Sequence, residues 1–197
     1  GKSTLIEALA VAWGFNAEGG SKDHQFATHA NHSVLHQFIR PIRDGKAYAH
    51  DGFFLRAESF FNVATYLEQT GGKRTGERPL HEQSHGEAFF ALFENRLMGD
   101  GLYIMDEPEA ALSPQRQLAF LAKLHQLVQA RSQLIIATHS PIILGYPDAW
   151  IYQASEHGLE RIEYEDTEHF TVTRGFLNRR QTFLDILLEE DEGPAPR

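Results

Sequence analysis

Carboxylates and a histidine follow two short apolar runs of this 197-residue sequence. Asp106 and Glu107 come directly after the run 102–105, and His139 comes just after the run 134–137. Apolar runs of this length between turn signals are typical of buried parallel strands. A carboxylate at a strand end can hold Mg²⁺ through water, a second can orient or deprotonate a water molecule, and an imidazole can contact a phosphate. The pattern therefore predicts metal-assisted chemistry on a phosphate group.

Each of these features has a plainer interpretation. An acidic pair after a strand is often a solvated turn, and a lone histidine at a strand end is often structural. The functional interpretation is favoured because Asp106 and Glu107 stand side by side at a strand end, and because His139 lies in the sequence Thr-His-Ser-Pro.

The first four residues are Gly1-Lys2-Ser3-Thr4, ahead of a helical segment. A P-loop ends in Gly-Lys-Ser/Thr and opens a helix whose N–H groups receive phosphate oxygens. Lys2 would reach the β- and γ-phosphates, Ser3 would bind Mg²⁺, and Thr4 would support the α-phosphate. Because the earlier glycines of a P-loop are not in the sequence, we expect an N-terminal segment to be missing. A chance GKST before a helix is the alternative.

The sequence Ser84-His85-Gly86-Glu87 begins another predicted helix. In one interpretation, Ser84 and Glu87 form a capping box, in which each side chain satisfies a backbone N–H of the first turn. In the other, this glycine-containing helix start binds an anion. Because it is far from Lys2 in the sequence, it would serve a phosphate held mainly by another subunit. Both interpretations stay open on the residues alone.

Strands and helices alternate along the chain, which predicts an α/β fold with a parallel sheet. Ligands of such sheets bind at the carboxyl ends of the strands. Helices are predicted at 3–13, 58–69, 84–98, 114–130 and 181–190, strands at 53–55, 102–105 and 134–137, and a hairpin at 149–153 and 159–164. Ser113 and Pro114 are expected to begin the long fourth helix as N-cap and first residue. Its predicted buried face consists of Leu118, Leu121, Leu124 and Val128.

The composition is that of a folded, acidic protein. Hydrophobic residues make up 42% and charged residues 23% of the chain. Eighteen Lys and Arg against 27 Asp and Glu give a net charge of −9, which disfavours a broad hold on nucleic-acid phosphates. There is no cysteine, so neither a disulfide nor a thiolate metal site is possible, and a reducing cytoplasm is expected. No apolar run approaches the ~20 residues that span a bilayer, so we expect no integral membrane segment.

The order of the motifs resembles the ABC-type ATPases, a class that includes transporter ATPase subunits and SMC-like chromosome and repair proteins. The order is GKST, SHGE, an apolar run with DEPEAALSP, and an apolar run with THSP. The compact spacing is most similar to the stand-alone AAA/ABC-like ATPases of bacteria, as are the stretches 54–61 and 164–169. The resemblance covers almost the whole chain and implies a P-loop NTPase fold: a mainly parallel sheet flanked by helices, with a helical insertion.

The resemblance also implies a domain organisation. It predicts one ATPase domain over residues 1–197 that lacks its N-terminal strand and the front of the P-loop. A helical and signature portion is expected at about 21–100, and a flexible tail at 191–197.

Site roles follow from the resemblance residue by residue. Residues 1–4 match the end of the Walker A loop, with Ser3 on Mg²⁺. Asp106 matches the Walker B aspartate and also holds Mg²⁺. Glu107 matches the catalytic glutamate that activates water, and His139 matches the switch histidine. ATP and Mg²⁺ are the implied cofactors.

The resemblance further implies a head-to-tail homodimer that forms with ATP. Ser84 and Gly86 match the signature sequence, which contacts the γ-phosphate of ATP on the partner subunit. Ala111, Leu112 and Ser113 match the loop that crosses the dimer interface. The expected function is ATP hydrolysis that drives a conformational cycle on an unknown macromolecular partner in the cytoplasm.

The sequence departs from the transporter pattern at several points. The signature is SHGE rather than serine-glycine-glycine-glutamine, Ser113 stands where transporters usually carry aspartate, and the glutamine-loop residue is unassigned in the region of Arg56 and Glu58. Three alternatives follow: a membrane-transporter ATPase subunit, a DNA-linked SMC-like ATPase, and a nucleotide-gated interaction module that does not hydrolyse ATP. The short spacing from Ser3 to Ser84 leaves no room for the long coiled coil of SMC-like proteins.

Overall fold

The chain forms two compact units, Gly1–Tyr146 and Pro147–Arg197. The structure, a computed structural model, describes residues 1–21, 33–42, 49–57 and 85–188. The predicted helix at 58–69 and the predicted tail at 191–197 lie outside these residues, as does Ser84. The organisation as one ATPase domain stays a prediction.

The first unit contains a three-stranded parallel sheet in the order β1-β2-β3. Its described elements are α1 (Lys2–Trp13), the 3₁₀ helix η1 (Val34–Phe38), β1 (Asp51–Arg56), α3 (His85–Arg96), β2 (Gly101–Asp106), the 3₁₀ helix η3 (Pro108–Ala111), α4 (Pro114–Gln129), β3 (Gln133–Ala137) and α5 (Pro141–Leu144). The α/β prediction and the predicted strands are confirmed. Every residue of β2 is buried, as expected for the central strand of a sheet with both faces covered.

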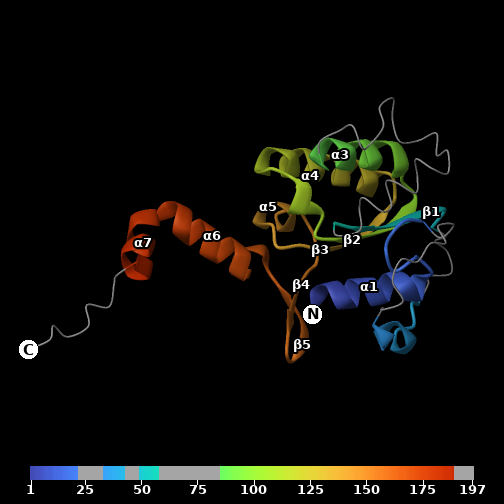
Figure 1. Ribbon diagram of the computed structural model, residues 1–197, viewed down its shortest axis with the longest axis horizontal. Coiled ribbons are helices and arrows are strands. Elements are labelled where there is room, and N and C mark those ends of the chain that lie inside the picture. Colours follow the sequence, from blue (N-terminus) through green and yellow to red (C-terminus); the bar gives the residue numbers. More distant parts are fainter. Residues whose placement is uncertain (22–32, 43–48, 58–84, 189–197) are drawn as a thin grey trace, which may run out of the picture. The chain divides into compact units, whose positions relative to one another are not determined.

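The sheet separates two hydrophobic cores because successive strand residues point to opposite faces. Figure 1 shows α1 on one face and α3 and α4 on the other. The α1 side contains Ile6, Ala10, Phe15, Phe54, Leu102, Ile104 and Ala137. The opposite side includes Phe53, Leu55, Tyr103 and Met105 from the strands and Phe93, Phe120, Leu124, Leu127 and Ile143 from the helices.

Helix α4 begins as predicted, but it buries a different face. Ser113 is its N-cap, and the Ser113 hydroxyl accepts a hydrogen bond from the Arg116 N–H. The predicted stripe is wrong at Leu118, which is 59% exposed, and at Val128, which is 38% exposed. The buried residues are Phe120, Leu124 and Leu127. The helix is rotated so that Phe120 packs edge-on against Phe93 of α3, with ring centroids 4.8 Å apart. An aromatic ring removes more apolar surface from water than Leu118 would.

An ion pair ties the amino end of the sheet to α3. The Asp51 carboxylate accepts hydrogen bonds of 2.8 Å from Arg96 and 2.8 Å from the Tyr103 hydroxyl. Burial by itself would raise the pKa of Asp51, but the hydrogen bond and charge of Arg96 and the bond from Tyr103 outweigh it and hold the pKa below its usual value. Burial and the neighbouring carboxylate raise the pKa of Tyr103, so its hydroxyl stays protonated and donates.

We expect Asp51 to make stability depend on pH in the acid range. Because its folded-state pKa lies below the unfolded value of 3.8, its contribution is present above about pH 4 and is lost as the pH falls through the folded pKa. Asp51→Asn should lower the free energy of unfolding by about 2 kcal/mol at neutral pH and flatten its decline in acid. Urea unfolding at a series of pH values measures both. Asp148→Asn, at an exposed carboxylate, is the control; an equal effect of the two substitutions would contradict the prediction.

The second unit contains a β-hairpin and two helices. The described elements are β4 (Ile151–Ser155), β5 (Gly158–Ile162), the 3₁₀ helix η4 (Tyr164–Asp166), α6 (Glu168–Asn178) and α7 (Arg180–Leu188). The antiparallel hairpin and the last helix are confirmed, whereas α6 was not predicted. Gly175 and β-branched residues weaken the helix signal there, while the buried Thr167 caps the helix start through the Phe170 N–H.

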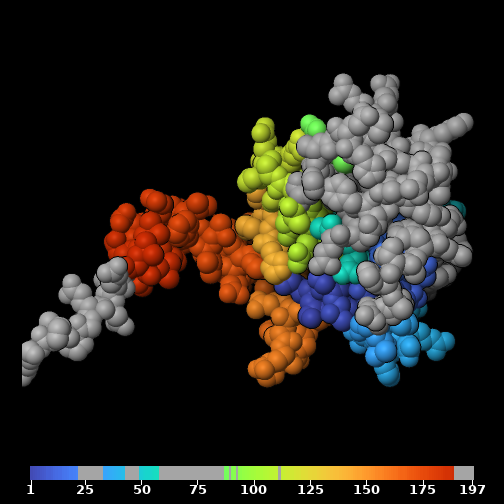
Figure 2. Space-filling model, in the orientation of Figure 1, coloured from blue at the N-terminus to red at the C-terminus, as the bar shows by residue number. Residues whose placement is uncertain are grey.

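Large apolar side chains are exposed on α6 and α7. Figure 2 shows the atoms of these helices in orange to red. More than half of the surface is exposed at Val172, Leu177, Ile186, Leu187 and Leu188. None of the helices among the described residues has the length and apolar run needed to cross a bilayer.

Candidate active site

The carboxyl ends of the three parallel strands form one edge of the sheet. Arg56 ends β1, Asp106 ends β2 and Ala137 ends β3. These residues lie in one row, because Arg56 is paired with Asp106 and Asp106 with Ala137 in the strand register. The side chains that follow the strands are therefore gathered at one edge, as the topology predicts.

Glu107 and His139 face each other at this edge. The Glu107 Oε1 atom lies 3.5 Å from His139 Nε2, and both side chains are about half exposed. Glu107 has the left-handed backbone conformation, with φ 51° and ψ 52°, which costs a non-glycine residue about 1–2 kcal/mol. Its N–H donates to the Ala137 carbonyl over 2.9 Å, which links the end of β2 to the end of β3. Strained residues of this kind are frequent at active sites.

Glu109, for which the sequence predicts no role, connects the two loops directly. Its Oε1 atom accepts a 2.6 Å hydrogen bond from the His139 N–H. Its Oε2 atom is buried and has no hydrogen-bond partner among the residues that the structure describes. The acidic sequence Asp-Glu-Pro-Glu at the strand end is the feature that could have indicated a role for Glu109. Its contact with His139, however, depends on the backbone turn at Glu107.

The loop that carries His139 is held on its other side as well. The Ser140 hydroxyl donates a 2.5 Å hydrogen bond to Gln117 of α4 and accepts from the N–H groups of Ile142 and Ile143. Ser140 thus caps α5 and joins it to α4. The backbone of His139 is consequently fixed while its ring stays accessible.

The beginning of α1 lies at the same edge. Glu7, in the second turn of α1, contacts Arg56 at the carboxyl end of β1. At the other end of the strand, a Cβ atom added to Gly52 would lie 2.8 Å from the ring of Phe15, which follows α1. Helix α1 therefore runs antiparallel to the strands, and residues 1–4 lie at the carboxyl edge.

Residues 1–4, the predicted phosphate-binding segment, form the start of α1. Gly1 is its N-cap, and no described side chain caps it. Lys2 and Ser3 are half-buried and Thr4 is exposed. The N–H groups of a helix start can bind a phosphate, and the role of this segment stays a prediction.

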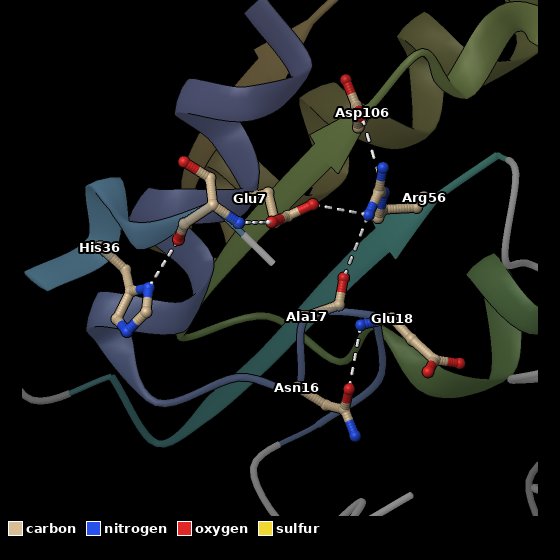
Figure 3. A network of polar contacts seen from close by, with 8 residues as sticks. Glu7, Asn16, Ala17, Glu18, His36, Arg56 and Asp106 are labelled. Carbon is tan, nitrogen blue, oxygen red and sulfur yellow. Dashed lines mark hydrogen bonds and ion pairs between the residues drawn. The ribbon is translucent and has the colours of Figure 1, made fainter. Parts of the chain in front are cut away.

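Arg56 joins α1 to the strand end. Its Nη1 atom donates to Glu7 Oε2 over 2.9 Å and to the Ala17 carbonyl over 3.3 Å, and its Nε lies 3.8 Å from Asp106 Oδ2 (Figure 3). Asp106 is buried. From the sequence, Arg56 lies in the region of the expected glutamine loop, and no role is predicted for it. Arg56 nevertheless follows an apolar run, as Asp106 does.

The predicted signature and interface residues are only partly described. Ser84 lies outside the described residues, so neither the capping box nor the anion-binding interpretation can be traced to a contact. Gly86 is in the first turn of α3, as the predicted helix start requires. Ala111 ends η3, Leu112 is buried, and Ser113 caps α4.

A parallel sheet flanked by helices, with acidic residues at its carboxyl edge and a helix start beside them, is the architecture of a P-loop NTPase domain. The profile of the AAA ATPase domain family matches residues 21–144, more than half of the chain. The chain therefore belongs to the AAA ATPase domain family, within the P-loop NTPase superfamily.

The chain is also similar to protein ea59 of Escherichia phage lambda. The two are 33% identical over 118 residues, which are 56% of this chain and 22% of ea59. The chain thus spans 22% of the length of that relative. No solved structure matches the chain significantly.

Proposed function

We propose that the chain binds ATP with Mg²⁺ at the carboxyl edge of its sheet and hydrolyses it. The observation that carries the proposal is the meeting of Glu107 and His139 beside Asp106, at the edge where α1 begins. Carboxylates and an imidazole gathered at the carboxyl ends of parallel strands can hold a cation and act on a reacting group. The family match supports the same conclusion.

The residues present fit a magnesium nucleotide. Mg²⁺ prefers oxygen ligands and is usually bound by one or two carboxylates or hydroxyls together with phosphates and water. Asp106 offers a carboxylate at the strand end, and Ser3 offers a hydroxyl in the first turn of α1. The bound ion would neutralise charge that develops on the phosphates. Lys2 and the N–H groups of α1 would hold the β- and γ-phosphates, with Gly1 and Thr4 completing the cradle.

Glu107 and His139 would act on the hydrolytic water. The Glu107 carboxylate orients the water and accepts its proton, while His139 donates a hydrogen bond to the γ-phosphate. Their 3.5 Å separation lets the imidazole and the carboxylate interact while both reach the same water. Glu109 keeps the backbone of His139 in register with Glu107 through its 2.6 Å hydrogen bond.

We further propose an ABC-type cycle in a head-to-tail homodimer. Ser84 and Gly86 of one subunit would contact the γ-phosphate held by the other, and residues 111–113 would cross the interface. The order of the four motifs supports this finer assignment. ATP binding would close the dimer and hydrolysis would loosen it, acting on a macromolecular partner. The cytoplasm is the proposed compartment.

Steady-state phosphate release from the full-length gene product tests the proposal. We expect turnover that requires ATP and Mg²⁺ together and that stops when EDTA removes the metal. Turnover without a divalent cation, or no binding of ATP at all, would contradict the proposal. Tight ATP binding without phosphate release would instead support the nucleotide-gated module.

A further inference from the structure

Arg56 holds one positive charge between two carboxylates from different elements. Glu7 comes from α1 and Asp106 from β2, whereas Arg56 itself ends β1 (Figure 3). The three side chains are largely withdrawn from water: Arg56 is 18% exposed, Glu7 13% and Asp106 7%. Charges in such surroundings interact more strongly than exposed ones, because water screens them less.

The Arg56 contact reaches the face of α1 that carries Ser3. Residues four apart in a helix lie on one face, so Glu7 lies one turn after Ser3 on the same side. The Glu7 carboxylate is also fixed through Oε1, which accepts from the Ser33 N–H over 3.2 Å. Arg56 therefore links the helix face that bears Ser3 to the strand end that bears Asp106.

We propose that Arg56 is a positioning residue that sets Asp106 and Ser3 at the separation one magnesium ion requires. The inference rests on the proposed function, because Ser3 and Asp106 are the proposed ligands. The guanidinium of Arg56 contacts both carboxylates, so it offsets the repulsion between their negative charges. Partners of metal ligands commonly orient them, and their loss weakens metal affinity about 10- to 100-fold.

A matched ion pair at the opposite edge of the sheet provides the control. Arg96 is also 18% exposed and contacts Asp51 over 2.8 Å, against 2.9 Å from Arg56 to Glu7. The two arginines lie at opposite ends of β1, one beside its first residue and one as its last. Loss of either should destabilise the fold, but only loss of Arg56 should alter the response to Mg²⁺.

The test is a Mg²⁺ titration of the binding of a fluorescent, non-hydrolysable ATP analogue to the full-length protein. We expect Arg56→Gln to raise the Mg²⁺ concentration at half-maximal binding by about 10- to 100-fold. Arg56→Lys should recover part of this loss, since it keeps the charge but not the planar fork. Glu7→Gln, a milder change, should shift the midpoint in the same direction. Arg96→Gln should leave it unchanged.

The outcomes separate this inference from the proposed function. If wild-type protein binds the analogue with Mg²⁺ and Arg56→Gln has the wild-type midpoint, or a lower one, the positioning role is wrong and the proposed function stands. If wild-type protein shows no Mg²⁺-dependent binding of the analogue, the proposed function is wrong, and the positioning role of Arg56 is wrong as well. Melting temperatures of the nucleotide-free variants identify any variant that does not fold. If Arg56→Gln does not fold, the Mg²⁺ midpoints of Glu7→Gln and Arg56→Lys test the positioning role in its place.

Discussion

Glu107→Gln is expected to lower the rate of ATP hydrolysis by about 100- to 10,000-fold, the usual contribution of a general base. The amide has the size of the carboxylate but cannot accept the proton of the attacking water. Nucleotide binding should persist, because Lys2, Ser3 and Asp106 are untouched. Single-turnover phosphate release and equilibrium ATP binding measure the two effects separately.

The same variant tests the proposed dimer. If hydrolysis loosens the subunits, Glu107→Gln with ATP and Mg²⁺ should accumulate as a dimer in size-exclusion chromatography. Glu156→Gln, the same substitution at an exposed residue of the β4–β5 turn, should behave as wild type. Equal hydrolysis by the Glu107 variant and wild type would remove Glu107 from the catalytic role.

Lys2→Ala is expected to weaken ATP binding by about 100-fold. Removing one partner of a buried, hydrogen-bonded charge pair costs about 2–5 kcal/mol, and 1.4 kcal/mol corresponds to a factor of ten. Isothermal titration calorimetry with ATP and Mg²⁺ on the full-length protein gives the dissociation constant. Because Lys2 is in the first turn of α1 and only half-buried, the fold should persist.

Lys123→Ala is the matched control for this prediction. Lys123 is half-buried on α4 and lies outside the carboxyl edge, so its loss should leave ATP affinity unchanged. Wild-type affinity in Lys2→Ala would contradict the assignment of residues 1–4 to phosphate binding. It would favour the alternative, a chance GKST sequence at a helix start.

The sequence was sufficient to predict which residues gather at the carboxyl edge of the sheet, where we propose the site. Short apolar runs predicted the strands, and the rule that parallel strands end at a common edge predicted that Asp106, Glu107 and His139 would be neighbours. Apolar runs and the residues that end them are adjacent in the sequence, so they can be recognised without knowledge of the tertiary packing. The N-cap Ser113 and the β4–β5 hairpin were predictable for the same reason.

The contacts that fix the site geometry depend on packing between distant residues. Arg56 and Glu7 are separated by 49 positions, and their contact exists because the second turn of α1 lies beside the carboxyl end of β1. The bond from His139 to Glu109 spans 30 positions and requires the left-handed turn at Glu107. No sequence pattern distinguishes that conformation at a glutamate. The rotation of α4 onto Phe120 likewise depends on the partner ring of Phe93.

A crystal structure of full-length Glu107→Gln with ATP and Mg²⁺ would show where the nucleotide binds. We expect one triphosphate at the carboxyl edge, with Lys2 on its β- and γ-phosphates, Ser3 and Asp106 on the metal, and His139 at the γ-phosphate. A nucleotide bound elsewhere in the protein, with Asp106 and His139 away from its phosphates, would contradict it.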